Sequence, residues 1–228
     1  MAATRYQLYY WPTIQGRGEF VRLALEDAGA DYVDVARRPG GIAKLEKLLE
    51  TGTHPSFAPP FLKAGKQVIG QTANILHFLG PRLRLAPKDE AGRLWLHQLQ
   101  LTIADWLVDV HDAHHPIGGA FYYEDQKPEA KRRAAHFRKE RLPQFLDYFE
   151  NLRDRPFSYV DLSLFQMVAG LRYAFPRAMA RLEPEYPRLV ALHDRVAARP
   201  RIAAYLASKR RIAFNRHGIF RHYPELDD

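Results

Sequence analysis

The chain contains no cysteine among its 228 residues. Disulfides, thiolate metal sites, dithiol redox chemistry and a cysteine nucleophile are therefore excluded. It also lacks long apolar runs: no stretch approaches the length of a membrane span, and the start, MAATRYQ, has no apolar segment of the kind found in signal peptides. We therefore expect a cytoplasmic protein with no membrane partner. The ten histidines are scattered without ligand spacing and predict no metal site.

The composition is that of a folded, basic protein. Hydrophobic residues make up 46% and aromatic residues 12%, which favours a globular chain over a disordered one. The formal net charge is +8, and the densest basic runs are Lys131–Arg133 and Lys209–Arg211. No aromatic residues alternate with these runs, so solvated helix faces explain them better than a nucleic-acid surface does. The positive field would still favour an anionic small ligand.

Residues 1–80 alternate between strand and helix patterns. The predicted elements are strands at Tyr6–Trp11 and Tyr32–Ala36, helices over Gly18–Gly29 and Ile42–Leu49, and a hairpin whose strands begin at Phe61 and Gln67. A further helix with one apolar face follows the hairpin. Two strands joined by a helix in this way run parallel. The sequence therefore predicts a β-α-β-α-β-β-α domain.

The start of the helix after the hairpin is a candidate binding site. Gly70, Gln71 and Thr72 lie where the first N–H groups of a helix have no partner within it. Thr72 can cap this end, and the same end attracts a carboxylate through its free amides and its dipole. The pair Pro59-Pro60 before the hairpin is unusual, because proline donates no ladder hydrogen bond and can adopt the cis form.

Residues 81–88 contain two prolines and predict a linker, and residues 89–228 have a helical period throughout. The first long helix is expected from Asp89 to about His115. A highly charged helix then follows Pro128 and runs to about Leu152, and Pro143 should bend it.

Two features mark the later part of the helical region. Ser158 and Asp161 precede an apolar helix with the spacing of a capping box, in which Asp replaces the usual Glu. The tail, residues 215–228, holds Phe220, His222 and Tyr223. It is too aromatic to be a free tail, and we expect it to pack near the cleft between the domains.

These motifs resemble glutathione transferases. A proline that opens a short hairpin, a Gln71-Thr72 pair six residues after the hairpin glycine, and a helix behind it are similar to the glutathione-binding half of that family. The Ser158–Asp161 box and the stretch VAARPRIAAYLAS also look like this family. The resemblance covers roughly residues 6–208. It implies an α/β plus all-α protein: a thioredoxin-like domain over 1–80, a linker over 81–88, and an all-helical domain over 89–228 with the aromatic tail.

The resemblance also implies a function. Tyrosine-type, bacterial-like members would be cytoplasmic homodimers that act in detoxification, conjugating their co-substrate glutathione to hydrophobic electrophiles without a metal. The alternative is a binding module of the same fold with weak or no turnover. A basic helical domain that contacts nucleic acid is a third hypothesis, and the absence of an aromatic-interleaved basic motif disfavours it.

The family pattern assigns roles to the residues around the hairpin. By that match Pro60 is a cis-proline, and Gln71 and Thr72 bind the γ-glutamyl end of glutathione. In the family, the residue before the cis-proline pairs with the cysteinyl backbone of glutathione like the edge of a sheet. Here that residue is Pro59, which has no N–H, so at most the carbonyl half of the pairing survives.

The catalytic group is expected at the end of the first strand. A hydroxyl that donates a hydrogen bond to the glutathione sulfur lowers the pKa of the thiol and adds no competing negative charge. The family carries a catalytic tyrosine in a Tyr-aromatic pair, and Tyr10-Trp11-Pro12 matches that pair. The loop after Pro12 is one residue longer than usual, which leaves Thr13 as an alternative donor.

Further glutathione-binding residues are expected on three segments. Arg17 lies at a helix start, where a basic residue is unfavourable to the dipole, and the family arginine it resembles lies near glutathione. Lys44 or Lys47 could reach the glycine carboxylate. Asp109 lies where some members send a carboxylate across a dimer interface. The resemblance places the electrophile pocket among imidazole and aromatic side chains, which core packing would explain equally well: Trp11, His114, His115, Phe121, Tyr122, Phe220 and Tyr223.

Overall fold

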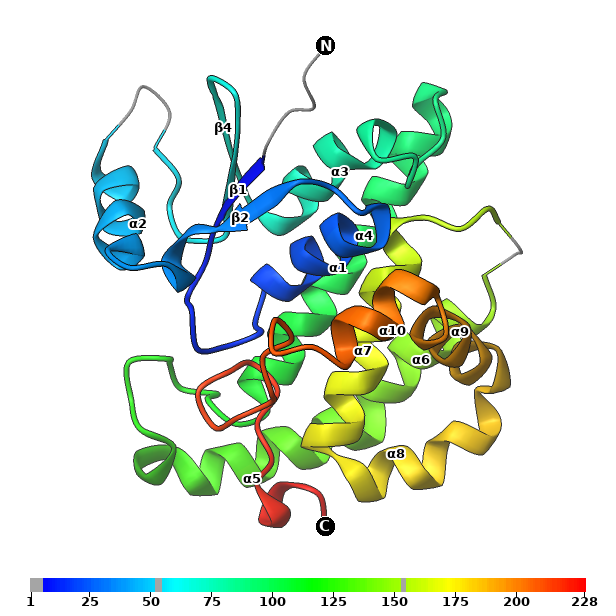
Figure 1. Cartoon of the computed structure of the whole chain (residues 1–228). Coiled ribbons are helices and arrows are strands. Elements are labelled where there is room, and N and C mark those ends of the chain that lie inside the picture. Colours follow the sequence, from blue (N-terminus) through cyan, green and yellow to red (C-terminus); the bar gives the residue numbers. More distant parts are fainter. Residues whose placement is uncertain (1–5, 52–54, 153–154) are drawn as a thin grey trace.

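The computed structural model describes residues 6–51, 55–152 and 155–228. A small sheet with three helices lies at one end of the molecule, and the other helices form the rest (Figure 1). The elements of the first part are β1 (Tyr6–Tyr9), α1 (Gly18–Ala28), β2 (Tyr32–Asp34), α2 (Gly41–Glu50), β3 (Phe61–Ala64), β4 (Gln67–Gly70) and α3 (Thr72–Arg82). The predicted β-α-β-α-β-β-α order is thus confirmed. The expectation that rested on residues 1–5 lies outside the described residues.

The sheet has the strand order β2-β1-β3-β4. Strand β1 pairs with β2 in parallel and with β3 antiparallel, and β3 pairs with β4 antiparallel. Successive side chains of a strand point to opposite faces. Leu8 and Leu62 accordingly belong to a core with α1 and α3, whereas Tyr9 and Phe61 belong to a core with Leu45 of α2. Both faces of the sheet are therefore covered.

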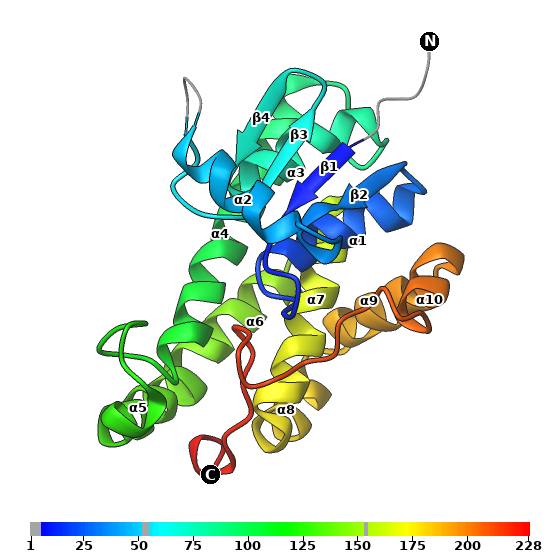
Figure 2. The same cartoon turned by 60° about the vertical axis from the view of Figure 1, so that its left-hand side comes forward.

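Helix α1 lies between the sheet and the helical part (Figure 2). Its Val21 and Leu25 pack with the sheet, whereas Phe20, Leu23 and Ala24 belong to the large core of the helical part. A helix that is covered on all sides must also bury its polar positions. This explains why the charged side chains of α1 form ion pairs and hydrogen bonds inside the molecule.

The helical part follows after residue 82. Its helices are α4 (Glu90–Asp112), α5 (Lys127–His136), α6 (Leu142–Glu150), α7 (Tyr159–Ala174), α8 (Pro176–Leu182), α9 (Pro187–Ala197) and α10 (Pro200–Leu206). The central α7 is buried along most of its length. The predicted all-helical region is confirmed, and the division at residues 80 and 89 stays a prediction.

Two expected elements differ in detail. The helix predicted to continue to Leu152 is divided by a π-helical turn at Phe137–Arg141, and α6 follows. Pro143 has no N–H for the carbonyl four residues earlier, and a wider turn accommodates such a missing bond. The first strand ends at Tyr9 rather than at Trp11, so Tyr10 stands at the start of a loop.

The aromatic tail is packed against the molecule, as expected. Ile219, Phe220 and Leu226 are buried, and Phe220 meets Phe214 edge to face. The segment just before it crosses to the loop that precedes α1: the Asn215 side chain donates to the Thr13 carbonyl at 2.8 Å. A segment close to the C-terminus therefore contacts the loop between β1 and α1 (Figure 2).

The predicted capping box at the start of α7 is confirmed. The Ser158 side chain accepts from the Val160 N–H at 3.3 Å, and the Asp161 carboxylate accepts from the Ser158 N–H at 2.7 Å. The Arg155 guanidinium donates to the same carboxylate at 2.7 Å.

Replacing Ser158 with alanine should lower the free energy of unfolding by about 1 kcal/mol, because the first turn of α7 loses its side-chain acceptor. Urea unfolding measures this loss. The matched control is Thr102→Ala, since the Thr102 hydroxyl only donates back to the Gln98 carbonyl within α4. Equal losses in the two variants would contradict the capping role.

Candidate functional site

The Tyr10 phenol lies beneath the loop that leads into α1. The residue is only 4% exposed, and its hydroxyl oxygen accepts the backbone N–H of Arg17 at 2.9 Å. Gly16 and Gly18 flank it: a Cβ at Gly16 would lie 2.1 Å from the Tyr10 oxygen, and one at Gly18 would lie 2.4 Å from the ring. Only glycine lets the loop approach the phenol so closely.

This environment keeps the hydroxyl protonated. Burial raises the pKa of Tyr10, while the Arg17 N–H and the charges of Arg17 and Arg22 act in the opposite direction. Because the oxygen already accepts one hydrogen bond, its own proton remains available for another acceptor. Tyr10 can therefore act as a neutral donor.

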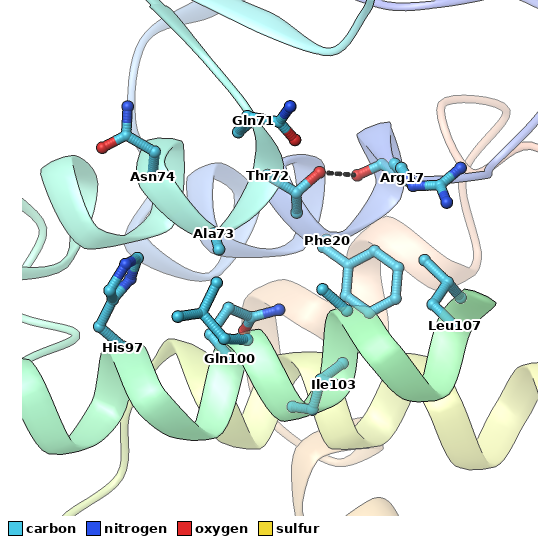
Figure 3. A pocket seen from close by; sticks show the side chains of 12 residues that line it. Arg17, Phe20, Gln71, Thr72, Ala73, Asn74, His97, Gln100, Ile103 and Leu107 are labelled. Atoms are coloured by element: carbon cyan, nitrogen blue, oxygen red, sulfur yellow. Dashed lines mark hydrogen bonds between the residues drawn. The ribbon is translucent and has the colours of Figure 1, made fainter. Parts of the chain in front are cut away.

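The start of α3 corrects the expected capping role of Thr72, while its expected role in binding glutathione stays a prediction. Gln71, not Thr72, occupies the position before the first helical residue, with a φ of 66°, and its side chain makes no capping hydrogen bond. The Thr72 hydroxyl instead donates to the Arg17 carbonyl at 3.3 Å (Figure 3). Thr72 cannot cap because it is itself the first residue of the helix. Within the part of the chain that the structure describes, the residue before α3 thus supplies no side-chain acceptor to the first N–H groups of the helix.

A cavity of about 230 Å³ lies between α1, the first turn of α3 and α4 (Figure 3). It brings together three of the predicted residues, Arg17, Gln71 and Thr72. The remaining lining side chains are Phe20, Ala73, Asn74, His97, Gln100, Leu101, Ile103, Ala104 and Leu107. Tyr10 does not line this cavity. Its hydroxyl is hydrogen-bonded to the backbone of Arg17, which is one of the lining residues.

The cavity-lining residues on α4 were not predicted from the sequence. His97, Gln100, Leu101 and Ala104 recur at the spacing of one helix face, which is the signal that could have identified them. The His97 Nδ1 atom is buried without a hydrogen-bond partner among the described residues. Gln100 accepts the Ser163 hydroxyl at 2.7 Å, so its amide group remains for another partner.

Other predicted residues lie outside this cavity. Thr13 is exposed, Lys44 is exposed on α2, and Trp11, next to Tyr10 in the chain, is exposed too. The Pro59–Pro60 bond is cis, as expected, and leads directly into β3.

Asp109 has partners within its own chain. Its two carboxylate oxygens accept from Arg133 and, at 2.8 Å, from Arg141. Each carboxylate oxygen thus has an arginine donor in the same chain. The expected role of Asp109 across a dimer interface stays a prediction.

None of the residues expected to form the electrophile pocket lines the cavity beside Arg17 and Thr72. His114, His115 and Phe220 are buried, whereas Phe121 and Tyr122 are exposed in the segment after α4. Tyr223 stacks on Tyr123 with ring centroids 3.7 Å apart. His114, just after α4, is hydrogen-bonded to the Ile219 carbonyl in the tail.

The two histidines at the end of α4 form a hydrogen-bonded chain with the tail. His114 Nε2 lies 2.7 Å from the Ile219 carbonyl, so this nitrogen carries the proton. His114 Nδ1 then accepts from His115 Nδ1, and His115 Nε2, 3.3 Å from Arg221, accepts from the guanidinium. Both imidazoles are neutral in this arrangement. Burial lowers the pKa of His114 to about 2 and that of His115 to about 4.

The described part of the chain contains no group of three or more histidine, aspartate or glutamate side chains placed to hold a metal ion. None of its helices is both long and apolar enough to cross a membrane.

The sequence is similar to known glutathione S-transferases. A family model described as the glutathione S-transferase C-terminal domain matches residues 111–209. Glutathione S-transferase P 1 of Xenopus laevis is 27% identical over 224 residues, which cover 90% of this chain and 93% of that protein. A glutathione S-transferase of Dirofilaria immitis is 26% identical over 218 residues, with the same coverage of 90% and 93%.

Solved structures of such proteins share the fold. The Pi-class glutathione S-transferase of Onchocerca volvulus has a TM-score of 0.68 at 22% identity, covering 88% of this chain and 91% of that one. The glutathione S-transferase of Ascaris lumbricoides has a TM-score of 0.66 at 20% identity, covering 89% and 96%. The thioredoxin-like domain followed by a helical domain is thereby confirmed.

The family model, the curated relatives and the fold all support a glutathione transferase. The names of the relatives support the predicted transferase class. The tyrosine-type subclass stays a prediction.

The histidine chain predicts how stability depends on pH. An ordinary histidine has a pKa of 6.5, so below that pH the unfolded protein binds protons that folded His114 and His115 do not accept. The free energy of unfolding should therefore be constant above about pH 7 and fall towards pH 4, by up to about 1.4 kcal/mol per pH unit for each histidine.

Urea unfolding at a series of pH values measures this slope. In the variant His115→Gln the slope of the free energy of unfolding between about pH 6.5 and 5 should decrease by about 1.4 kcal/mol per pH unit, which corresponds to one proton fewer taken up on unfolding. The control is His217→Gln, because His217 is exposed and its side chain is outside the chain of hydrogen bonds. An unchanged slope in His115→Gln would contradict the neutral pair.

Proposed function

We propose that the protein conjugates the thiolate of glutathione to hydrophobic electrophiles, with the Tyr10 hydroxyl stabilising the thiolate. One observation carries the proposal. The backbone of Arg17 joins the predicted catalytic and binding residues: its N–H donates to the Tyr10 hydroxyl and its carbonyl accepts from Thr72. A single residue thus fixes the distance between the sulfur donor and the start of α3.

The chemistry requires a thiolate at neutral pH. A free thiol has a pKa of about 8.5, so only a few per cent is ionised. A neutral hydroxyl aimed at the sulfur favours the charged form. Tyr10 suits this role because its raised pKa keeps the proton on the phenol and its oxygen is already held by Arg17.

The γ-glutamyl end of glutathione would bind at the start of α3. The free N–H groups and the dipole of the helix favour a carboxylate there. The Gln71 side chain is exposed beside these amides, and Arg17 lines the same cavity. Lys44 and Lys47, both exposed on α2, are candidates for the glycine carboxylate.

The second candidate function is a binding module of the same fold with weak or no turnover. Pro59 favours it, because proline cannot donate the backbone hydrogen bond that its position would supply to the cysteinyl part of glutathione. Retention on immobilised glutathione with elution by free glutathione tests binding. Turnover of an activated aryl halide then separates the enzyme from the binding module.

We also propose a homodimer in the cytoplasm that acts in detoxification. Exposed apolar side chains on α4 support the dimer: Leu94, Leu101 and Val108 recur every seven residues and so lie along one side of the helix. Phe57, which is 97% exposed, is a further apolar side chain without cover. The absence of cysteine is consistent with a reducing compartment.

Tyr10→Phe should reduce turnover roughly 10- to 100-fold, because only the hydrogen bond to the thiolate is lost. The affinity for glutathione should change little, and the thiol pKa in the complex should rise. Steady-state kinetics and calorimetry measure the two effects. If Tyr10→Phe keeps full activity and Thr13→Val loses it, the hydroxyl role belongs to Thr13.

Pro59→Leu should tighten glutathione binding several-fold, because leucine restores a backbone N–H that would bond to the cysteinyl carbonyl, a contribution of about 1 kcal/mol. Calorimetry on the variant and on the original protein measures the change. The exposed Pro55, in the same loop, provides the control variant Pro55→Leu. Unchanged or weaker binding in Pro59→Leu would mean that glutathione does not pair with this segment.

A further inference from the structure

Arg22 is a fully buried arginine on α1, directly behind the proposed catalytic tyrosine. Its guanidinium carbon lies 5.7 Å from the centre of the Tyr10 ring. Burial of a charge is costly unless charged and polar partners replace water. Arg22 has two carboxylate partners: Glu19 at 3.2 Å and Asp34, at the end of β2, at 2.7 Å.

The remaining contacts of Arg22 are to the loop before α1. Its Nη1 atom lies 3.3 Å from the Ile14 carbonyl and 3.4 Å from the Gln15 carbonyl. Its Nη2 atom is buried with no hydrogen-bond partner among the described residues. A guanidinium that served only to neutralise the two carboxylates would not need to reach these carbonyls. The geometry therefore couples Arg22 to the loop.

The loop in turn determines where the Tyr10 proton points. Only Gly16 separates Gln15, whose carbonyl Arg22 contacts, from Arg17, whose N–H donates to the Tyr10 oxygen. If the loop shifts, the Arg17 N–H leaves the phenol oxygen. The hydroxyl could then rotate to other acceptors and would no longer be fixed as a donor to sulfur.

We propose that Arg22 is a positioning residue for the transferase reaction: from inside the protein it holds the 14–17 loop so that the Arg17 N–H fixes the Tyr10 hydroxyl. This inference rests on the proposed function of Tyr10. Arg22 touches neither substrate nor sulfur. It acts through the loop.

The charges around Arg22 argue for geometry rather than net charge as its main effect. Glu19 and Asp34 are negative, and Arg211 adds a second positive charge because it also binds Glu19. The Tyr205 hydroxyl donates to the same Glu19 carboxylate at 2.7 Å. Two positive and two negative groups thus balance. A lysine in place of Arg22 would keep the charge but could not form the planar fork to carboxylates and carbonyls together.

The test compares Arg22→Lys with Arg199→Lys. Arg199 also joins α1 to the rest of the protein, through Asp27 Oδ1 at 2.5 Å and Oδ2 at 2.9 Å, but it contacts neither the loop nor Tyr10. Both variants should lower the melting temperature. Only Arg22→Lys should raise the thiol pKa of bound glutathione, by about 0.5 to 1 unit, read from the ultraviolet absorption of the thiolate.

Kinetics provide a second readout. In Arg22→Lys, kcat/KM at pH 6.5 should fall about 3- to 10-fold, following the change in thiol pKa, while the glutathione affinity stays within about two-fold. Arg199→Lys should leave both values unchanged. If the two variants lose the same stability and both keep the thiol pKa of the original protein, Arg22 has a structural role only and the proposal fails.

A third measurement does not depend on glutathione. The Tyr10 ring carbon that bears the hydroxyl, assigned by its loss in Tyr10→Phe, gives an NMR signal that reports the hydrogen bond from Arg17. Its chemical shift should change in Arg22→Lys, and in the milder variant Asp34→Asn, but not in Arg199→Lys. An unchanged shift would overturn the positioning role even if the protein formed no thiolate. Absence of the thiolate in the original protein would instead refute the proposed function of Tyr10.

Discussion

Burial of α1 on every side is the constraint on which the structure depends. Its apolar residues pack into two hydrophobic cores, one with the sheet and one with the helical part. Its charged residues must therefore form pairs inside the protein. The partners come mainly from the last part of the chain: Tyr205 and Arg211 bind Glu19, Arg210 binds Glu26, and Arg199 binds Asp27. These directional contacts fix how the helical part sits against the sheet in a way that apolar packing alone would not.

The candidate site is a consequence of that burial. Because α1 is fixed, the loop before it has a defined position, and Gly16 and Gly18 bring that loop onto the Tyr10 phenol. The backbone of Arg17 then connects the phenol to Thr72 at the start of α3. The proposed chemistry thus depends on backbone atoms at least as much as on the side chains of Arg17 and Thr72.

The sequence predicted what local patterns determine. Strand alternation, the glycine after α1, and the Ser158–Asp161 box have local causes, and each was found where expected. The capping role predicted for Thr72 was wrong, because α3 begins at Thr72 itself and the residue before the helix is Gln71, with a positive φ that the sequence does not reveal. The buried His114–His115 pair and the Gln100 wall of the cavity depend on contacts between distant segments, which one sequence without relatives does not reveal.

The contact between the tail and the loop before α1 has a consequence for synthesis of the chain. Asn215 donates to the Thr13 carbonyl, and the Gln15 side chain contacts the Ile212 carbonyl. A growing polypeptide emerges from the ribosome with its N-terminus first. The first domain is therefore complete in sequence long before the residues that hold its loop have been translated. Premature termination near residue 210 would keep every residue of the sheet but remove Ile212 and Asn215, which contact this loop from the other side.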